Sequence, residues 1–205
     1  MELYFAPLSC SLATRIALYE GDIPVRFHQV ELATKRTTDS RDYFAINPKG
    51  QVPALITDDG SILTEGPAVL QFVADLKPES ALAPPAGTAA RYEPQKWLNY
   101  IATEIHKGVY YLIFNPAVPA EAKTFARESV AGKYDFLSTH LAHRDYLLDG
   151  FTVADAYLGT TLGWAQPGGV DLARWPVLIR YLTKLRERPA VARAMQDELK
   201  LAGRA

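Results

Sequence analysis

The chain has 205 residues, of which 48% are hydrophobic and 22% are charged. This is the composition of an ordinary globular protein and excludes wholesale disorder. Its 22 basic and 23 acidic residues leave a formal net charge of −1, so the charge balance favours neither a nucleic acid nor a membrane surface as partner. We expect one large domain or two small ones around a buried core.

The first residues indicate a cytoplasmic protein. Residues 1–5 include an early acid and are followed by Pro7, which does not suit a secretory signal. No apolar run approaches the ~18–20 residues that span a bilayer. Cys10 is the only cysteine, so no intramolecular disulfide can form, and a reducing compartment is expected.

The first eighty residues alternate strand-like and helical patterns. Residues 3–5 and 25–30 are expected as strands, residues 53–63 as a hairpin around an Asp-Asp-Gly turn, and residues 12–20 and 65–76 as helices. The strand that opens at Val52 and Pro53 should be central. The order β-α-β, long loop, β-β-α suits a small α/β sandwich.

Beyond residue 77 the strand signals stop. Residues 77–87 are rich in Pro, Ala and Gly, as an interdomain linker is. Residues 91–114, 120–141, 153–164 and 176–201 are all expected to be helical. Thr152 and Asp155 have the spacing of a capping box, and the apolar helix after them should be buried.

Cys10 stands at the apparent start of the first helix. Backbone N–H groups there favour a thiolate and can lower a cysteine pKa from about 8.5 to roughly 3.5–7.5. The alternative is a small buried filler, since free cysteine is among the most buried residue types. Position alone does not decide between the two interpretations.

The run NPKGQVPAL at residues 47–55 is the second informative feature. A proline tolerated at the start of a central strand is a candidate for a cis peptide bond, and an ordinary loop proline is the alternative. A thiol at the first βα junction, followed by a proline before a later strand, is the thioredoxin-like arrangement. There the backbone beside the proline pairs with a peptide-like ligand.

Two helical segments add polar groups. Glu65 and Gly66 start a helix that can hold a carboxylate at its N–H groups and an ammonium at Glu65; a plain helix start is the alternative. Asn99, Thr103 and His106 have the spacing of one helix face, which predicts a shared site unless that face is merely solvated.

With these motifs in place, the chain resembles a cytosolic glutathione transferase, most closely the bacterial beta class. The resemblance covers essentially the full length. It is carried by Ser9-Cys10-Ser11, the NPKGQVPAL run and Leu63-Thr64-Glu65-Gly66. In the second half it is carried by residues 97–99, 104–108 and 151–157 (WLN, EIHKG and FTVADAY).

The resemblance implies an α/β thioredoxin-like N-terminal domain at residues 1–80, a linker at 81–87 and an all-α C-terminal domain at 88–205. Such an enzyme conjugates reduced glutathione to small hydrophobic electrophiles in detoxification, and usually forms a homodimer. Thiol-disulfide exchange through Cys10 stays open. The alternatives are a glutathione-dependent reductive dehalogenase or thioltransferase, and a non-catalytic glutathione-fold binding protein.

The resemblance also implies which residues are catalytic and which bind glutathione. The catalytic candidates are Cys10, Ser11 and His106. The candidate glutathione-binding residues are Cys10, Lys35, Gln51, Val52, Pro53, Glu65, Gly66, Asn99, Thr103, Glu104, Ile105 and His106. No metal is expected, because His140 and His143 alone do not make a zinc site.

Further residues bear on the electrophile. Tyr110, Tyr111, Phe114 and Trp164 either wall its site or only pack in the core. Two residues depart from the family pattern. Leu8, where relatives often have glycine, should narrow the mouth beside Cys10. Arg15 should favour the Cys10 thiolate if it lies close enough.

Overall fold

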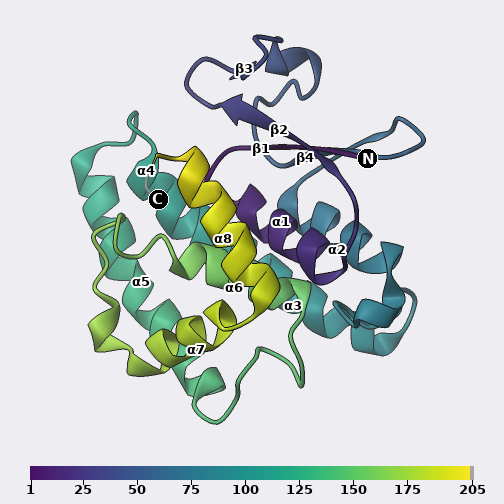
Figure 1. Ribbon diagram of the computed structural model, residues 1–205. Coiled ribbons are helices and arrows are strands. Elements are labelled where there is room, and N and C mark those ends of the chain that lie inside the picture. The colour runs from purple at the N-terminus through teal and green to yellow at the C-terminus, as the bar shows by residue number, and fades with distance from the viewer. Residues whose placement is uncertain (204–205) are drawn as a thin grey trace.

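The computed structural model describes residues 1–203, and Figure 1 shows their arrangement. The elements of the first part are β1 (Glu2–Phe5), α1 (Ser11–Glu20), β2 (Arg26–Glu31), β3 (Arg36–Thr37), β4 (Ala54–Ile56), β5 (Ile62–Thr64) and α2 (Gly66–Leu76). The second part contains α3 (Tyr92–Tyr100), a π-helix (Ile101–Tyr110), α4 (Tyr111–Phe114), α5 (Ala120–Leu141), α6 (Val153–Leu162), α7 (Pro176–Arg186) and α8 (Pro189–Leu201). Short 3-10 turns cover Tyr43–Ala45, Pro78–Ser80, Ala89–Arg91 and Leu172–Arg174.

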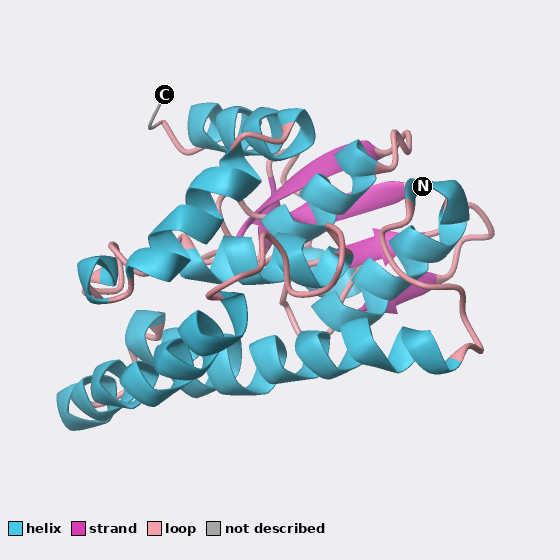
Figure 2. Cartoon of the chain, turned by 90° about the horizontal axis from the view of Figure 1, so that it is seen from below, coloured by secondary structure: helices cyan, strands magenta, loops and turns pink. Residues whose placement is uncertain are grey.

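The strands form one mixed sheet in the order β3-β2-β1-β4-β5. β1 pairs in parallel with β2 and antiparallel with β4, and β4 forms the predicted hairpin with β5. β4 is therefore an internal strand, as expected. Helices α1 and α2 lie together beside this sheet (Figures 1 and 2).

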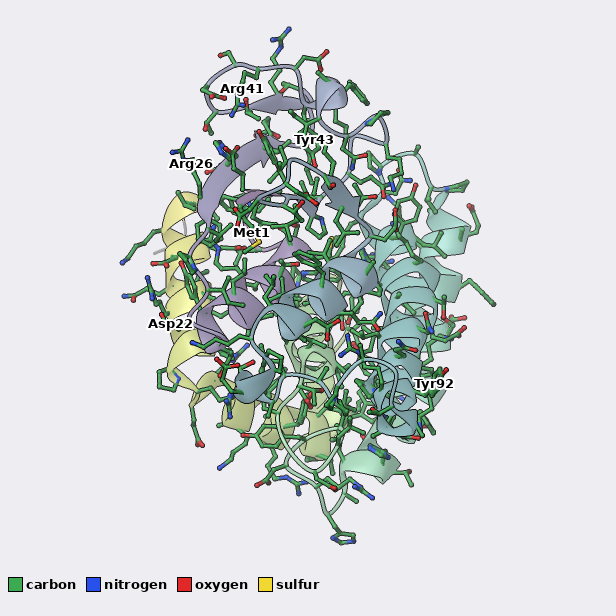
Figure 3. All side chains as sticks on the ribbon, turned by 90° about the vertical axis from the view of Figure 1, so that its right-hand side faces the viewer. Met1, Asp22, Arg26, Arg41, Tyr43 and Tyr92 are labelled. Atoms are coloured by element: carbon green, nitrogen blue, oxygen red, sulfur yellow. The ribbon has the colours of Figure 1, made fainter. Side chains whose placement is uncertain are left out.

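β3 was not predicted from the sequence. It has only two residues, Arg36 and Thr37, and so offers no alternation to detect. The chain after it covers the sheet on the side away from the helices, where Figure 3 labels Tyr43. The Tyr43 ring is fully buried against Tyr4. This segment closes a second small core and leads into the 47–55 run.

The helices of the second part follow the predicted segments with one correction. α5 has the expected bounds, and Asp155 accepts the backbone N–H of Thr152 at 2.8 Å in the predicted capping box. The segment 176–201 is not one helix. It divides into α7 and α8, because Pro189 lacks an N–H and holds Arg188 in an extended conformation (φ −73°, ψ 128°).

The segment 91–114 is helical throughout, but its middle is a π-helix. The N–H of Tyr111 donates to the carbonyl of His106, five residues earlier. A Cβ at position 108 would lie 2.8 Å from the carbonyl oxygen of Thr103. Gly108 therefore allows the backbone to approach closely in this wider turn.

Helix α1 lies between the two parts of the molecule. It packs against α2 on one side and against α6 and α8 on the other. All residues from Ser11 to Leu18 are buried, so no face of the first two turns is exposed. Among residues 1–203, no helix combines the length and the apolar character needed to cross a bilayer.

The buried carboxylate of Asp155 should be the most sensitive polar group of the second part. It accepts Leu147 N–H and Tyr181 O–H, each at 2.8 Å, besides the Thr152 cap. Asp155→Ala leaves these buried donors without an acceptor, at about 1–3 kcal/mol for each. We expect urea unfolding to show a loss of about 3 kcal/mol or more. The exposed Asp145→Ala is the control, and an equal loss in both variants would contradict the prediction.

Candidate active site

A cavity of about 1230 Å³ lies where the two parts of the chain meet. Most of the residues singled out from the sequence line it. They are Cys10, Lys35, Gln51, Val52, Pro53, Glu65, Gly66, Asn99, Thr103 and His106. The first seven come from the sheet part and the last three from the helical part, so the fold brings together residues up to 96 positions apart (106 − 10).

Cys10 is partly buried at the N-terminal end of α1. Its Sγ donates to the carbonyl oxygen of Val52 at 3.1 Å. Burial raises the pKa of Cys10 to about 11, although the charge of Lys107 and the N–H groups of Cys10 and Ser11 act in the opposite direction. The expectation of a lowered pKa is wrong for this state of the protein, because desolvation outweighs the helix terminus. Cys10 is a neutral thiol at pH 7.

The 47–55 run forms a rigid loop opposite Cys10. The Val52–Pro53 bond is cis, as predicted. Tyr43 Oη and Asn47 Nδ2 both donate to the carbonyl oxygen of Gln51 at 2.7 Å. Two buried side chains therefore fix the peptide just before Val52, so that Val52 presents its backbone to the cavity.

Lys35 and Gly50 bound the same loop. Lys35 Nζ donates to the carbonyl oxygen of Gly50 at 2.8 Å. Gly50 has a φ of +60°, and a Cβ there would lie 2.8 Å from the Phe44 ring. Glycine is needed for both reasons. The result is an ammonium group held at one end of the cavity.

Glu65 stands at the start of α2 with a positive φ of 67° and a ψ of 114°. Its Oε1 lies 2.5 Å from Lys49 Nζ, which also donates to Thr64 Oγ1 at 2.8 Å. Both side chains of the ion pair are well exposed, so water screens the attraction. An incoming ammonium group can replace that of Lys49 at little cost.

The helical wall carries His106. Its Nδ1 lies 2.7 Å from the hydroxyl of Tyr157. Burial lowers the pKa of His106 to about 4, and the charge of Lys107 adds to this effect. The imidazole is therefore neutral at pH 7. It can share a proton with Tyr157 but brings no positive charge to the cavity.

Aromatic rings form the remaining wall. Tyr110, Tyr111, Phe114 and Trp164 all line the cavity. The Tyr110 and Phe114 rings stack at 5.9 Å, and the Trp164 ring meets the His106 ring at 5.1 Å. Tyr110 is also fully buried in the core, whereas Tyr111 and Phe114 are exposed, so core packing does not describe these last two. The wall suits an apolar, flat molecule.

Three predicted site residues do not line the cavity. Ser11 is fully buried, and its Oγ accepts the N–H of Ala6 at 3.2 Å. Ile105 is fully buried in the core. Glu104 points to α5, where Lys133 Nζ lies 2.6 Å away. The helix periodicity explains the last two, because neighbours of Thr103 and His106 in sequence point to other sides of the helix.

Arg15 also lies elsewhere than expected. Its guanidinium sits 4.3 Å from the Phe5 ring centre and 3.8 Å from that of Phe27. Its Nε donates to Glu198 Oε1 at 2.9 Å. Arg15 therefore ties α1 to α8, and the cation that acts on Cys10 is Lys107.

Lys107 is the site residue that the sequence reasoning missed. It lines the cavity, and its ammonium favours a nearby negative charge. Asn99, Thr103 and Lys107 follow one another at intervals of four residues. The spacing that selected Asn99 and Thr103 could therefore have selected Lys107 as well. Among residues 1–203, no group of three or more His, Cys, Asp or Glu side chains could hold a metal ion.

Comparisons with known proteins agree with this geometry. Residues 9–76 match the model of the glutathione S-transferase N-terminal domain, and residues 90–195 match that of the C-terminal domain. Glutathione S-transferase GstA of Escherichia coli O157:H7 is 40% identical, with 97% of this chain and 98% of GstA covered. The chain belongs to the glutathione S-transferase family, and its enzyme class is a transferase.

Solved structures of bacterial glutathione S-transferases are also similar to this chain over nearly its full length. A ternary complex of BphK, a bacterial glutathione S-transferase, has a TM-score of 0.93 at 43% identity and covers 97% of this chain and 99% of its own. A sphingomonad glutathione S-transferase complexed with glutathione has a TM-score of 0.92 at 42% identity, with 97% and 98% covered. A bacterial beta-class enzyme of Sphingomonas chungbukensis has a TM-score of 0.93 at 38% identity, with 97% and 98% covered.

The raised pKa of Cys10 predicts slow alkylation of the ligand-free protein. With a pKa of about 11, the thiolate fraction grows about tenfold for each pH unit between 7 and 10 without a plateau. The rate of iodoacetamide addition, followed by mass spectrometry, should increase in the same way. Lys107→Met removes the favourable charge and should slow the reaction further. A plateau below pH 8 would contradict the prediction.

Proposed function

We propose that this transferase binds reduced glutathione in the cavity and joins its sulfur to small hydrophobic electrophiles. The observation that carries the proposal is the cavity itself, where a peptide-binding loop, an anion and cations face an aromatic wall. Val52 offers backbone groups to the cysteinyl residue of glutathione. Glu65 and Gly66 hold the γ-glutamyl end, whose ammonium replaces that of Lys49.

The remaining polar groups complete the tripeptide site. Lys35 and Gln51 lie where the glycine carboxylate of glutathione would reach. Asn99 and Thr103 line the other side. Catalysis then depends on holding the glutathione sulfur as a thiolate near the start of α1, with fixed N–H dipoles and the charge of Lys107 in place of water.

Cys10 has a defined part in this scheme. A neutral thiol donates a hydrogen bond, so Cys10 stabilises the glutathione thiolate once its S–H turns from Val52 to the ligand. The thiol of glutathione loses its proton to solvent, the resulting thiolate attacks the electrophilic carbon, and the leaving group departs with the bonding electrons, so no oxidant is consumed. The neutral His106 lies on the electrophile side, within hydrogen-bond reach of Tyr157.

A second candidate function is thiol-disulfide exchange, because Cys10 itself lines the cavity. In that reaction the Cys10 thiolate attacks glutathione disulfide, forms a mixed disulfide and releases a glutathione thiolate. The raised pKa of Cys10 makes this reaction slow at pH 7 in the ligand-free protein. Conjugation is therefore the principal proposal.

We also propose the domain bounds, the oligomeric state, the compartment and the biological role from the family resemblance. We place a thioredoxin-like domain at residues 1–80, a linker at 81–87 and a helical domain at 88–205. We propose a cytoplasmic homodimer that acts in detoxification. Exposed apolar side chains on α2 and α3, among them Leu76 and Tyr92, support a partner subunit there. Sedimentation at micromolar concentration distinguishes a dimer from a monomer.

Glu65→Gln tests the glutathione site. Loss of the carboxylate removes a charge-assisted contact to the ammonium group of glutathione, so KM for glutathione should rise roughly tenfold while kcat changes less. The assay is conjugation of 1-chloro-2,4-dinitrobenzene. Glu79→Gln, an exposed acid outside the cavity, is the matched control. Equal KM values in both variants would contradict the assignment of Glu65.

Cys10→Ala separates the two candidate functions. Conjugation by thiolate stabilisation should survive with kcat reduced roughly tenfold, since one hydrogen-bond donor is lost. Mass spectrometry after incubation with glutathione disulfide should show one reducible glutathionyl group only in the parent protein, and only slowly at pH 7. Fast labelling together with complete loss of conjugation in Cys10→Ala would favour exchange instead.

A further inference from the structure

The backbone of Leu8, two residues before Cys10, has an uncommon conformation. Its φ is 59°, in the left-handed region that favours glycine, yet the residue is leucine. Leu8 lines the cavity beside Cys10 and is partly buried. A branched side chain is thus held at a backbone position that disfavours side chains, in the same cavity wall as the thiol.

Two hydrogen bonds from the helical part fix the Leu8 backbone. Its N–H donates to Glu198 Oε2 of α8 at 2.6 Å. Its carbonyl oxygen accepts Nε1–H of Trp164 at 2.9 Å. Both partners are more than 150 residues away in sequence, so the tertiary structure holds both polar groups of this residue.

Each partner is itself fixed. Glu198 is fully buried, and its other oxygen accepts Nε–H of Arg15 at 2.9 Å. The Trp164 ring meets the His106 ring at 5.1 Å and the Tyr110 ring at 5.7 Å, with both rings on the cavity wall. The position of Leu8 is therefore coupled to the aromatic wall and to α8.

We propose that Leu8 is a specificity-determining residue for the electrophile, and that Trp164 and Glu198 are positioning residues that hold its side chain between the sulfur and the aromatic wall. The isobutyl group narrows the approach to the sulfur, so narrow single rings enter readily and wider fused rings do not. This inference rests on the proposed conjugation of glutathione to electrophiles.

The test compares two substrates with the same reacting carbon and the same chloride leaving group. They are 1-chloro-2,4-dinitrobenzene and the wider 1-chloro-2,4-dinitronaphthalene. The measured quantity is the ratio of kcat/KM for the naphthalene to that for the benzene. Leu8→Ala replaces the isobutyl group with a methyl group and should raise this ratio roughly tenfold, with KM for glutathione unchanged.

Control variants separate specificity from loss of stability. Ile179→Ala shortens a side chain of the same four carbons at an exposed position of α7 outside the cavity and should leave the ratio unchanged. Leu8→Gly removes the whole isobutyl group and also suits the left-handed backbone, so it provides a folded variant if Leu8→Ala is unstable. An unchanged ratio in both Leu8 variants overturns the proposal.

The positioning residues have their own pair of variants. Trp164→Phe keeps an aromatic ring but loses the N–H that holds Leu8, so the ratio should rise in the same direction. Trp175→Phe loses a comparable indole bond, to Asp135 at 2.6 Å, outside the cavity. Its ratio should equal that of the parent. Glu198→Gln disturbs the N–H contact and should raise the ratio as well.

The outcomes keep this inference apart from the function on which it rests. A parent protein that conjugates neither halide overturns the proposed function, and the inference with it. A parent that conjugates both, with a ratio insensitive to Leu8→Ala and Leu8→Gly, overturns only the specificity role. A ratio that responds to the Leu8 variants but equally to Trp164→Phe and Trp175→Phe overturns the role of Trp164.

Discussion

The burial of helix α1 from Ser11 to Leu18 is the constraint on which the rest of the structure depends. The helix starts at the thiol of Cys10 and carries Arg15 in its second turn, so its polar groups need partners inside the protein. Glu198 supplies one from α8. Removing one partner of such a buried pair costs about 3–5 kcal/mol, because the other charge is left uncompensated. The site therefore depends on α8 being in place.

Ion pairs at the surface of the cavity-forming elements also join the two parts of the chain. Arg188, just before α8, lies 2.7 Å from Glu20 at the end of α1. Arg91 lies 2.7 Å from Asp75 of α2 and also donates to the carbonyl of Pro84. These contacts connect the two walls of the cavity. One wall presents the 47–55 loop and the other an aromatic surface.

Burial changes the pKa values of the cavity residues more than the N-terminus of α1 does. The pKa of the Cys10 thiol rises and that of His106 falls, because both charged forms lose water. Lys107 is exposed, and its charge acts against the rise in the pKa of Cys10. The cavity therefore combines a neutral thiol and a neutral imidazole with the ammonium groups of Lys35 and Lys107.

The sequence by itself determined the elements with strong local signals. The hairpin, the limits of α5 and the capping box at Thr152 follow from turn residues, periodicity and chemistry within a few positions. The cis bond before Pro53 was predicted from its combination with the distant Cys10 and from the family resemblance, because an isolated proline is more often trans. The spacing of Asn99, Thr103 and His106 likewise placed them on one wall. The break at Pro189 was also a local signal, but the helical periodicity on both sides of it obscured the division.

Only the tertiary structure determined which side chains are buried and how burial changes their contacts and pKa values. It put Ser11 and Ile105 into the core, turned Arg15 toward Glu198 and raised the pKa of Cys10. No local pattern encodes the contact of Leu8 with residues 156 and 190 positions away. Periodicity tells which face of a helix is apolar, whereas hydrogen-bond partners and desolvation depend on what the rest of the chain packs against that face.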